Sequence, residues 1–137
     1  MQKSDDRRVL HPPAWKAASG YANGILASGP LVFVGGQIGW NADQAFESDD
    51  LVEQARRALQ NVVDVLAEAG AGPAEIVRLT WYVIDRREYK ARRKEIGQVY
   101  RTVIGRHFPA MTLVEVSGLV EDEAKVEIEA TAVLSGS

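Results

Sequence analysis

The residues best able to do chemistry lie on two strand-like runs near the C-terminus. In KVEIEATAV, residues 125–133, alternation places Glu127 and Glu129 on one face and apolar side chains on the other. A half-exposed strand often carries glutamates only for solubility. A glutamate that faces an apolar pocket would instead have a raised pKa, which suits it to hold and transfer a proton near neutral pH. The spacing is compatible with both roles.

The other run is FPAMTLVEV, which begins at Phe108. Alternation puts Met111 and Leu113 on the same face of that strand. Two further aromatic residues, Tyr21 and Trp40, flank glycine-containing turns and do not belong to periodic runs. Such residues either pack the turn or line a pocket. The sequence therefore indicates a sheet that carries carboxylates close to apolar and aromatic side chains.

A cluster of positive residues could bind an anionic partner. Its members are Arg86, Arg87, Lys90, Arg92, Arg93 and Lys94. The simpler interpretation is a solvated helix face that Glu88 and Glu95 partly neutralise. The net charge of −3 gives no overall attraction to nucleic acid or to acidic membranes, so neither partner is expected.

Composition excludes several enzyme classes. The chain has no cysteine, and its two histidines, His11 and His107, lack metal-ligand spacing, so neither a thiol nucleophile nor a metal site is expected. The GGQIG run lacks the spacing of a dinucleotide-binding loop, and no cofactor is expected. No apolar run is long enough to cross a membrane, and the polar N-terminus does not resemble a signal peptide. We therefore expect a cytoplasmic protein.

The elements that must position these residues follow from periodicity and turn signals. We predict a loose arm over residues 1–14 and a single domain over residues 15–134. The expected elements are a β-hairpin around Asn23-Gly24 and Ser28-Gly29-Pro30, a helix from Leu51 to Ala69 capped by Asp50 and stopped by Gly70, a strand over 75–84, a second helix over 86–104 capped by Asp85, and the two C-terminal strands.

This order, β-β-α-β-α-β-β, predicts an α+β fold with two helices on one face of a mostly antiparallel sheet. The β-α-β step supplies one parallel connection. Two helices cover only one face, and the other is expected to carry Trp, Phe and Val residues. Association with further copies of the chain would cover them, so we expect a homo-oligomer.

Four segments together resemble the Rid (RidA/YjgF) family of enamine and imine deaminases. They are GGQI at 35–38, AGAGPAEIVRLTWYV at 69–83, FPAMTLVEV and KVEIEATAV. The resemblance implies a chorismate-mutase-like fold and a homotrimer whose small-molecule substrates bind in three clefts between subunits. It also implies cofactor-free hydrolysis, in which an enamine tautomerises to an imine, water attacks the imine carbon and ammonia leaves.

The resemblance also implies roles for individual residues. Glu127 corresponds to the glutamate that holds and activates water, and the backbone carbonyl of Leu113 would orient the same water. Tyr21 would line the cleft, and the backbone N–H of Gly36 would contact the substrate carboxylate. Gly35 stands where a serine is common.

Two departures from the family pattern bear on the substrate. Met111 occupies the position of an arginine that binds the substrate carboxylate, and Gly97 that of a pocket asparagine. Met111, Trp40 and Phe108 would suit a larger and flatter ligand, as in a divergent branch that includes 2-aminomuconate-deaminase-like proteins. The carboxylate would then need another partner, such as Arg106 or His107.

Three functions follow from the sequence. The leading one is hydrolytic deamination of an enamine or imine intermediate in catabolism. The alternative is a non-catalytic trimer that binds a small metabolite in the same clefts, which the absence of the arginine favours. A third, an RNA-acting translation inhibitor, rests on the naming history of the family and on the basic cluster.

Overall fold

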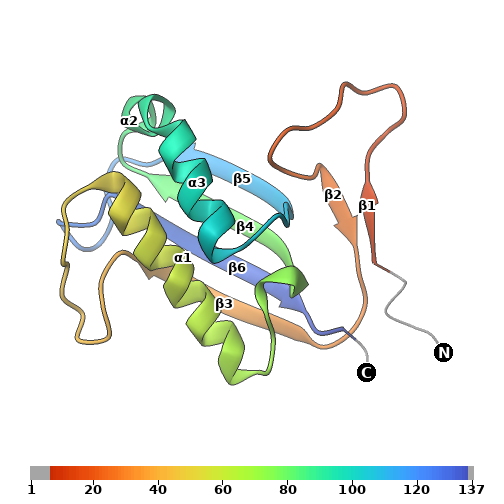
Figure 1. The fold of residues 1–137 in the computed structure, drawn as a ribbon, viewed down its shortest axis with the longest axis horizontal. Helices are drawn as coiled ribbons and strands as arrows, with labels where there is room; N and C mark the ends of the chain where they lie inside the picture. The colour runs from red at the N-terminus through yellow and green to blue at the C-terminus, as the bar shows by residue number, and fades with distance from the viewer. Residues whose placement is uncertain (1–6, 136–137) are drawn as a thin grey trace.

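The computed structural model describes residues 7–135 as a layer of helices packed on a sheet (Figure 1). The strands are β1 (Arg8–Leu10), β2 (Gly24–Leu26), β3 (Leu31–Ile38), β4 (Ile76–Val83), β5 (Ala110–Glu115) and β6 (Val126–Val133). The helices are α1 (Leu51–Glu68), α2 (Arg86–Ala91) and α3 (Arg93–Val103), with a short 3-10 turn at Pro73–Glu75.

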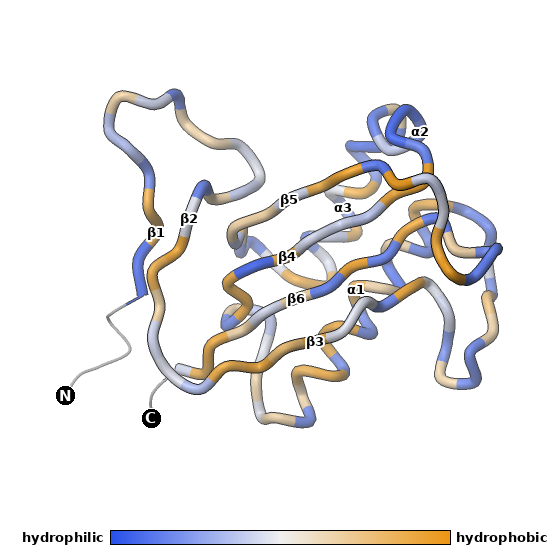
Figure 2. Tube along the Cα trace, turned by 180° about the vertical axis from the view of Figure 1, so that it is seen from behind, coloured by the Kyte–Doolittle hydropathy of each residue, from blue (hydrophilic) through white to orange (hydrophobic). Residues whose placement is uncertain are grey.

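The main sheet has the strand order β3-β6-β4-β5. Strands β4 and β5 are parallel, whereas the β3/β6 and β4/β6 pairs are antiparallel. The helices lie over one face of this sheet, and the view from behind shows the other face without a helix in front of it (Figures 1 and 2). The predicted α+β fold on a mostly antiparallel sheet is confirmed.

The first predicted helix is also confirmed. The Asp50 side chain accepts a hydrogen bond from the backbone N–H of Glu53 at 3.2 Å, and Gly70 follows the helix with a φ of 74°. One polar residue on the buried face of α1, Gln54, is 1% exposed. Its side chain donates to the carbonyls of Ser48 and Glu123 and accepts from the Lys125 N–H, so it joins α1 to the segment before β6.

Strand β6 has the alternation expected from the sequence. Val126, Ile128, Ala130 and Ala132 are buried, while Glu127, Glu129 and Thr131 face away from the helices and remain partly exposed. In β4 the pairing register shifts between Ile76 and Arg78. This irregularity explains why the buried residues Ile76, Leu79, Trp81 and Val83 do not alternate perfectly along the sequence.

The prediction of one continuous second helix is wrong, because the helix is interrupted at Arg92. This residue ends α2 and begins α3 with a φ of −107° and a ψ of 15°. Its guanidinium forms ion pairs with Asp50 at 2.9 Å and with Glu95 at 2.7 Å. No glycine or proline marks the break in the sequence, and the Arg92–Asp50 ion pair joins it to the start of α1.

The predicted β-hairpin is also wrong, because β2 pairs with β1 and not with β3. The β1–β2 pair forms a separate sheet beside the main one (Figure 1). Strand β1 falls within the predicted N-terminal arm, and Arg7 next to it donates hydrogen bonds to the carbonyls of Ala74 and Val133, both at 2.7 Å. The remainder of that arm, residues 1–6, lies outside the described residues.

The open face of the sheet is more polar than the sequence led us to expect. Trp81 is only 2% exposed and lies under the helices, so the prediction that tryptophans need covering on the open face is wrong. Phe33, at 72% exposed, is the largest apolar side chain exposed along β3. Its neighbours across that face include Arg78, Thr80 and Glu129. Among residues 7–135, no helix is long and apolar enough to span a bilayer.

Candidate functional site

A cavity of about 760 Å³ lies on the helix side of the sheet, next to strand β5. Its lining comes from the loop before β2, from β4 and β5, and from helices α2 and α3. The lining residues are Ser19, Gly20, Tyr21, Trp81, Tyr89, Arg93, Lys94, Ile96, Gly97, Tyr100, Arg101, Phe108, Met111 and Leu113. Its size is within the usual range for small-molecule sites.

The aromatic side chains of this cavity are held by one another. Tyr100 and Phe108 stack with ring centroids 5.7 Å apart, and Trp81 meets Tyr89 edge to face at 6.4 Å. The Tyr100 hydroxyl donates to the His107 carbonyl at 2.6 Å. Burial raises the pKa of both Tyr89 and Tyr100 above the ordinary value. These phenols therefore stay neutral near pH 7 and can donate hydrogen bonds but cannot act as bases.

Tyr21 reaches the cavity because its loop is attached to the start of β5. The Ala22 N–H donates to the Pro109 carbonyl at 3.0 Å, and Ala22 forms an isolated parallel bridge with Ala110. This attachment brings a segment far from β5 in sequence beside Phe108. It explains how the turn before β2 becomes part of the cavity wall.

Glu127 lies on the opposite face of the sheet. Trp81 and Tyr82 are successive residues of β4 and point to opposite faces; Trp81 lines the cavity, whereas Tyr82 is the register partner of Glu127. The Tyr82 hydroxyl donates to Glu129 at 2.9 Å, and that bond to a carboxylate raises the pKa of Tyr82. Among the described residues, the Glu127 carboxylate has no hydrogen-bond partner, so it remains available to a ligand or to water.

Gly36 lies directly against the Glu127 carboxylate. A Cβ built on Gly36 would overlap that carboxylate and would stand 2.7 Å from its Cδ atom. Only glycine therefore leaves the Glu127 side chain in its present position.

Substituting Gly36→Ala should displace the Glu127 carboxylate while leaving the fold intact, because the overlapping atoms are the far end of a flexible side chain. If Glu127 acts in turnover, the variant should lose activity by about tenfold or more with a Tm within a few degrees of wild type. Gly118→Ala, in the loop after β5, is the control, since a Cβ there meets nothing within 4 Å and Gly118 lines neither the cavity nor the groove of the open face. Equal losses in the two variants would contradict a positioning role for Gly36.

The structure divides the residues predicted from sequence into three groups. Tyr21, Phe108, Met111 and Leu113 line the cavity. Gly36 and Glu127 are in contact on the open face, and Gly35 lies on a groove of that face with Phe33 and Glu129. Trp40 lines neither; its ring packs on Phe46 at 5.9 Å, and its carbonyl accepts from Asn61, as expected for a packed turn.

Five of the six residues of the basic cluster are exposed, as expected for a solvated helix face; they are Arg86, Arg87, Lys90, Arg93 and Lys94. Arg92 is engaged in ion pairs, the Arg93 guanidinium lies 5.9 Å from the Tyr89 ring centroid, and Arg93 and Lys94 line the cavity. Arg101, which was not predicted from the sequence, also lines the cavity. Helical spacing was the available signal, since residues 93, 97 and 101 lie four apart on one face of α3.

Arg106 and His107, suggested above as carboxylate partners, do not line the cavity. The His107 Nε2 atom is 2.7 Å from the Ile76 carbonyl oxygen, so this ring holds the segment before β5 against β4. Within residues 7–135, no group of three His, Asp or Glu side chains could hold a metal ion.

The chain is similar to a known family over nearly its whole length. The family model described as Endoribonuclease L-PSP matches residues 12–134. A RutC family protein of Haemophilus influenzae is 34% identical over 126 residues, covering 92% of this chain and 96% of the relative. The 2-iminobutanoate/2-iminopropanoate deaminase of Salmonella typhimurium is 33% identical over 108 residues, covering 77% and 80%. A solved structure of a Rid family protein from Yersinia pestis, YyfB, described as of unknown function, has a TM-score of 0.84 at 33% identity and covers 94% and 99%.

Proposed function

Because the chain belongs to the Endoribonuclease L-PSP family, which includes the Rid proteins, we propose that it hydrolyses an enamine or imine and releases ammonia. A relative named as an imine deaminase supports this reaction class. The single observation that carries the proposal is the Glu127 carboxylate, which rests against Gly36 and has no hydrogen-bond partner among the described residues. A carboxylate in that state can hold a water molecule and accept its proton.

The positions of the predicted residues support a site between copies of the chain. Glu127 and Gly36 lie on one face of the sheet, whereas Tyr21, Met111 and Leu113 line a cavity on the other. Within one protomer, a ligand in the cavity is separated from Glu127 by the sheet itself. We propose that the open face of one protomer meets the cavity of the next in a homotrimer, which completes each site.

The proposed reaction needs no cofactor. Protonation of the enamine carbon gives the iminium ion, and the water held by Glu127 adds to its carbon as the carboxylate takes one proton, which leaves a neutral carbinolamine. Transfer of that proton to nitrogen breaks the C–N bond and releases ammonia, and loss of the hydroxyl proton to solvent as the C=O bond forms leaves a ketone. The Leu113 carbonyl would orient the water, and Tyr21 and the Gly36 N–H would bind the substrate.

The experiment is an ammonia-release assay on two substrate classes, generated in situ because enamines hydrolyse spontaneously. The small class is 2-aminoacrylate, and the larger, flatter class is 2-aminomuconate. We expect a rate above the spontaneous one, and greater for the larger class, because the cavity has a volume of about 760 Å³ and Met111 stands on its wall. Rates no higher than the spontaneous ones for both classes would exclude deamination of these substrates.

A non-catalytic binding protein is the second candidate. Met111 favours it, because a thioether on the cavity wall cannot form the ion pair that an arginine would supply there. Binding of a small ligand without ammonia release from either substrate class would support it. An action on RNA is less well supported, because the ion pairs of Arg92 and the position of Arg93 and Lys94 at the cavity divide the basic cluster.

A further inference from the structure

Within one protomer, the cavity wall carries positive charge and no carboxylate. Arg93, Lys94 and Arg101 line it, and no aspartate or glutamate does. In the described part of the chain, none of these three side chains forms an ion pair. All three side chains are exposed, on a chain whose net charge is −3.

Two of these cations stand one turn before and one turn after Gly97 on one face of helix α3. Arg93, Gly97 and Arg101 are spaced four residues apart, so their Cα atoms follow one line along the helix. Gly97 has no side chain, and the Arg101 guanidinium folds back over it, with Nη1 3.5 Å from where a Cβ would stand. We call Arg93, Gly97 and Arg101 the α3 notch. A planar anionic group beside Gly97 would contact the Arg101 guanidinium, and Arg93, whose guanidinium lies 5.9 Å from the Tyr89 ring centroid, follows on the same helix face.

Trp81 adds an unsatisfied hydrogen-bond donor beside the cavity. Trp81 lines the cavity and is 2% exposed, and its buried indole N–H finds no acceptor among the described residues. An unsatisfied buried donor is uncommon in native structures. Tyr89 and Tyr21 add hydroxyl groups to the same wall. Within one protomer, the lining therefore offers hydrogen-bond donors and positive charge without a carboxylate.

We infer that the α3 notch binds the carboxylate of a planar, conjugated ligand whose body lies against Trp81, Tyr89 and the Tyr100–Phe108 stack. A guanidinium binds a carboxylate through two parallel hydrogen bonds, and aromatic faces favour a flat unsaturated body. The notch thus supplies the positive charge that Met111 cannot. The inference adds to the proposed function the group that binds the carboxylate of an unsaturated substrate. Binding at the notch does not depend on the proposed function; only the statement that the bound ligand is a substrate rests on it.

The test uses trans-cinnamate as the probe, because it is a planar conjugated carboxylate without an imine and cannot be turned over. Its uncharged counterpart is cinnamamide. By calorimetry, the wild-type protein should bind cinnamate about tenfold or more tightly than cinnamamide, and Arg101→Met should remove most of that preference. Gly97→Leu should weaken cinnamate binding while both arginines remain, because its side chain fills the notch.

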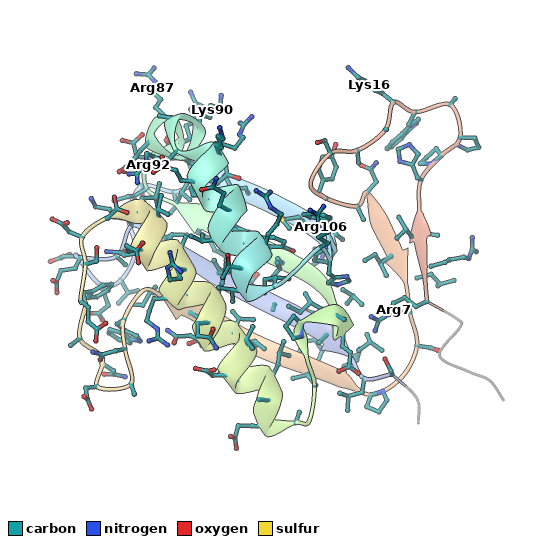
Figure 3. All side chains as sticks on the ribbon, in the orientation of Figure 1. Arg7, Lys16, Arg87, Lys90, Arg92 and Arg106 are labelled. Carbon is teal, nitrogen blue, oxygen red and sulfur yellow. The ribbon has the colours of Figure 1, made fainter. Side chains whose placement is uncertain are left out.

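Arg87→Met is the matched control. Arg87 lies on α2, is exposed, does not line the cavity and points away from the body of the molecule (Figure 3). It removes the same charge and should leave the preference for cinnamate unchanged. Three results would overturn the inference: no preference for cinnamate in the wild type, a preference that survives in Arg101→Met, or equal losses in Arg87→Met and Arg101→Met.

The binding test separates this inference from the proposed function. If cinnamate binding depends on Arg101 and no ammonia is released from any imine, carboxylate binding at the notch is supported and the deaminase proposal is refuted. If ammonia is released and the Arg101→Met variant binds cinnamate as the wild type does, the deaminase proposal is supported and carboxylate binding at the notch is refuted.

Discussion

Replacing Glu127 by glutamine should lower the rate of ammonia release about 100-fold or more, since the amide cannot accept a proton from water. The substitution keeps the size of the side chain and its contact with Gly36. Because Glu127 has no hydrogen-bond partner among the described residues, the change should alter Tm by no more than a few degrees. The measurement is kcat for ammonia release, corrected for the spontaneous rate, together with thermal unfolding.

Glu129→Gln is the control for this experiment. Glu129 lies two residues along the same strand, on the same face, and already accepts a hydrogen bond from Tyr82 at 2.9 Å. Its loss should change the rate by no more than a few-fold. Equal rates for wild type and Glu127→Gln would contradict the proposed role of Glu127. Equal losses of rate in Glu127→Gln and Glu129→Gln would also contradict it, because they would show that any loss of charge on the open face of the sheet lowers the rate.

Mixing two inactive variants should restore activity if each site is shared between protomers. One variant is Glu127→Gln, which disables the open face. The other is Gly97→Phe, which fills the cavity; a Cβ at Gly97 makes only ordinary contact with Arg101, so the helix should tolerate the ring. In a randomly mixed oligomer, about one quarter of the sites combine an intact face with an intact cavity, so the mixture should recover about one quarter of wild-type activity.

The recovery is measured after the two variants are unfolded and refolded together at equal concentration. Each variant refolded alone is the first control and should stay inactive. Wild type refolded with Gly97→Phe is the second, and it should show about half of wild-type activity, because half of the cavities remain open. No recovery in the mixed sample, with normal recovery in the second control, would place Glu127 and the cavity in the same site of one protomer.

The sequence was sufficient to predict the elements whose periodicity is strong. Helix α1 was predicted from its apolar spacing and from Asp50, and the alternation of β6 was predicted from KVEIEATAV. Both patterns depend on local geometry, which sequence spacing records directly. The pairing of β2 with β1 was not predicted, because it depends on a partner that local spacing does not record, and no glycine or proline marks the break at Arg92.

For the site, the sequence by itself determined which side chains share a face of a strand, and so it grouped Glu127 with Glu129 and Met111 with Leu113. It could not determine which of the two faces the helices cover, because that depends on how the strands are ordered and packed. Only the tertiary structure placed Glu127 against Gly36 on the open face, and Met111 and Leu113 in a cavity on the other. It also brought Arg101 to that cavity, because one face of α3, with Arg93, Gly97 and Arg101, lines the same cavity as Met111 of β5.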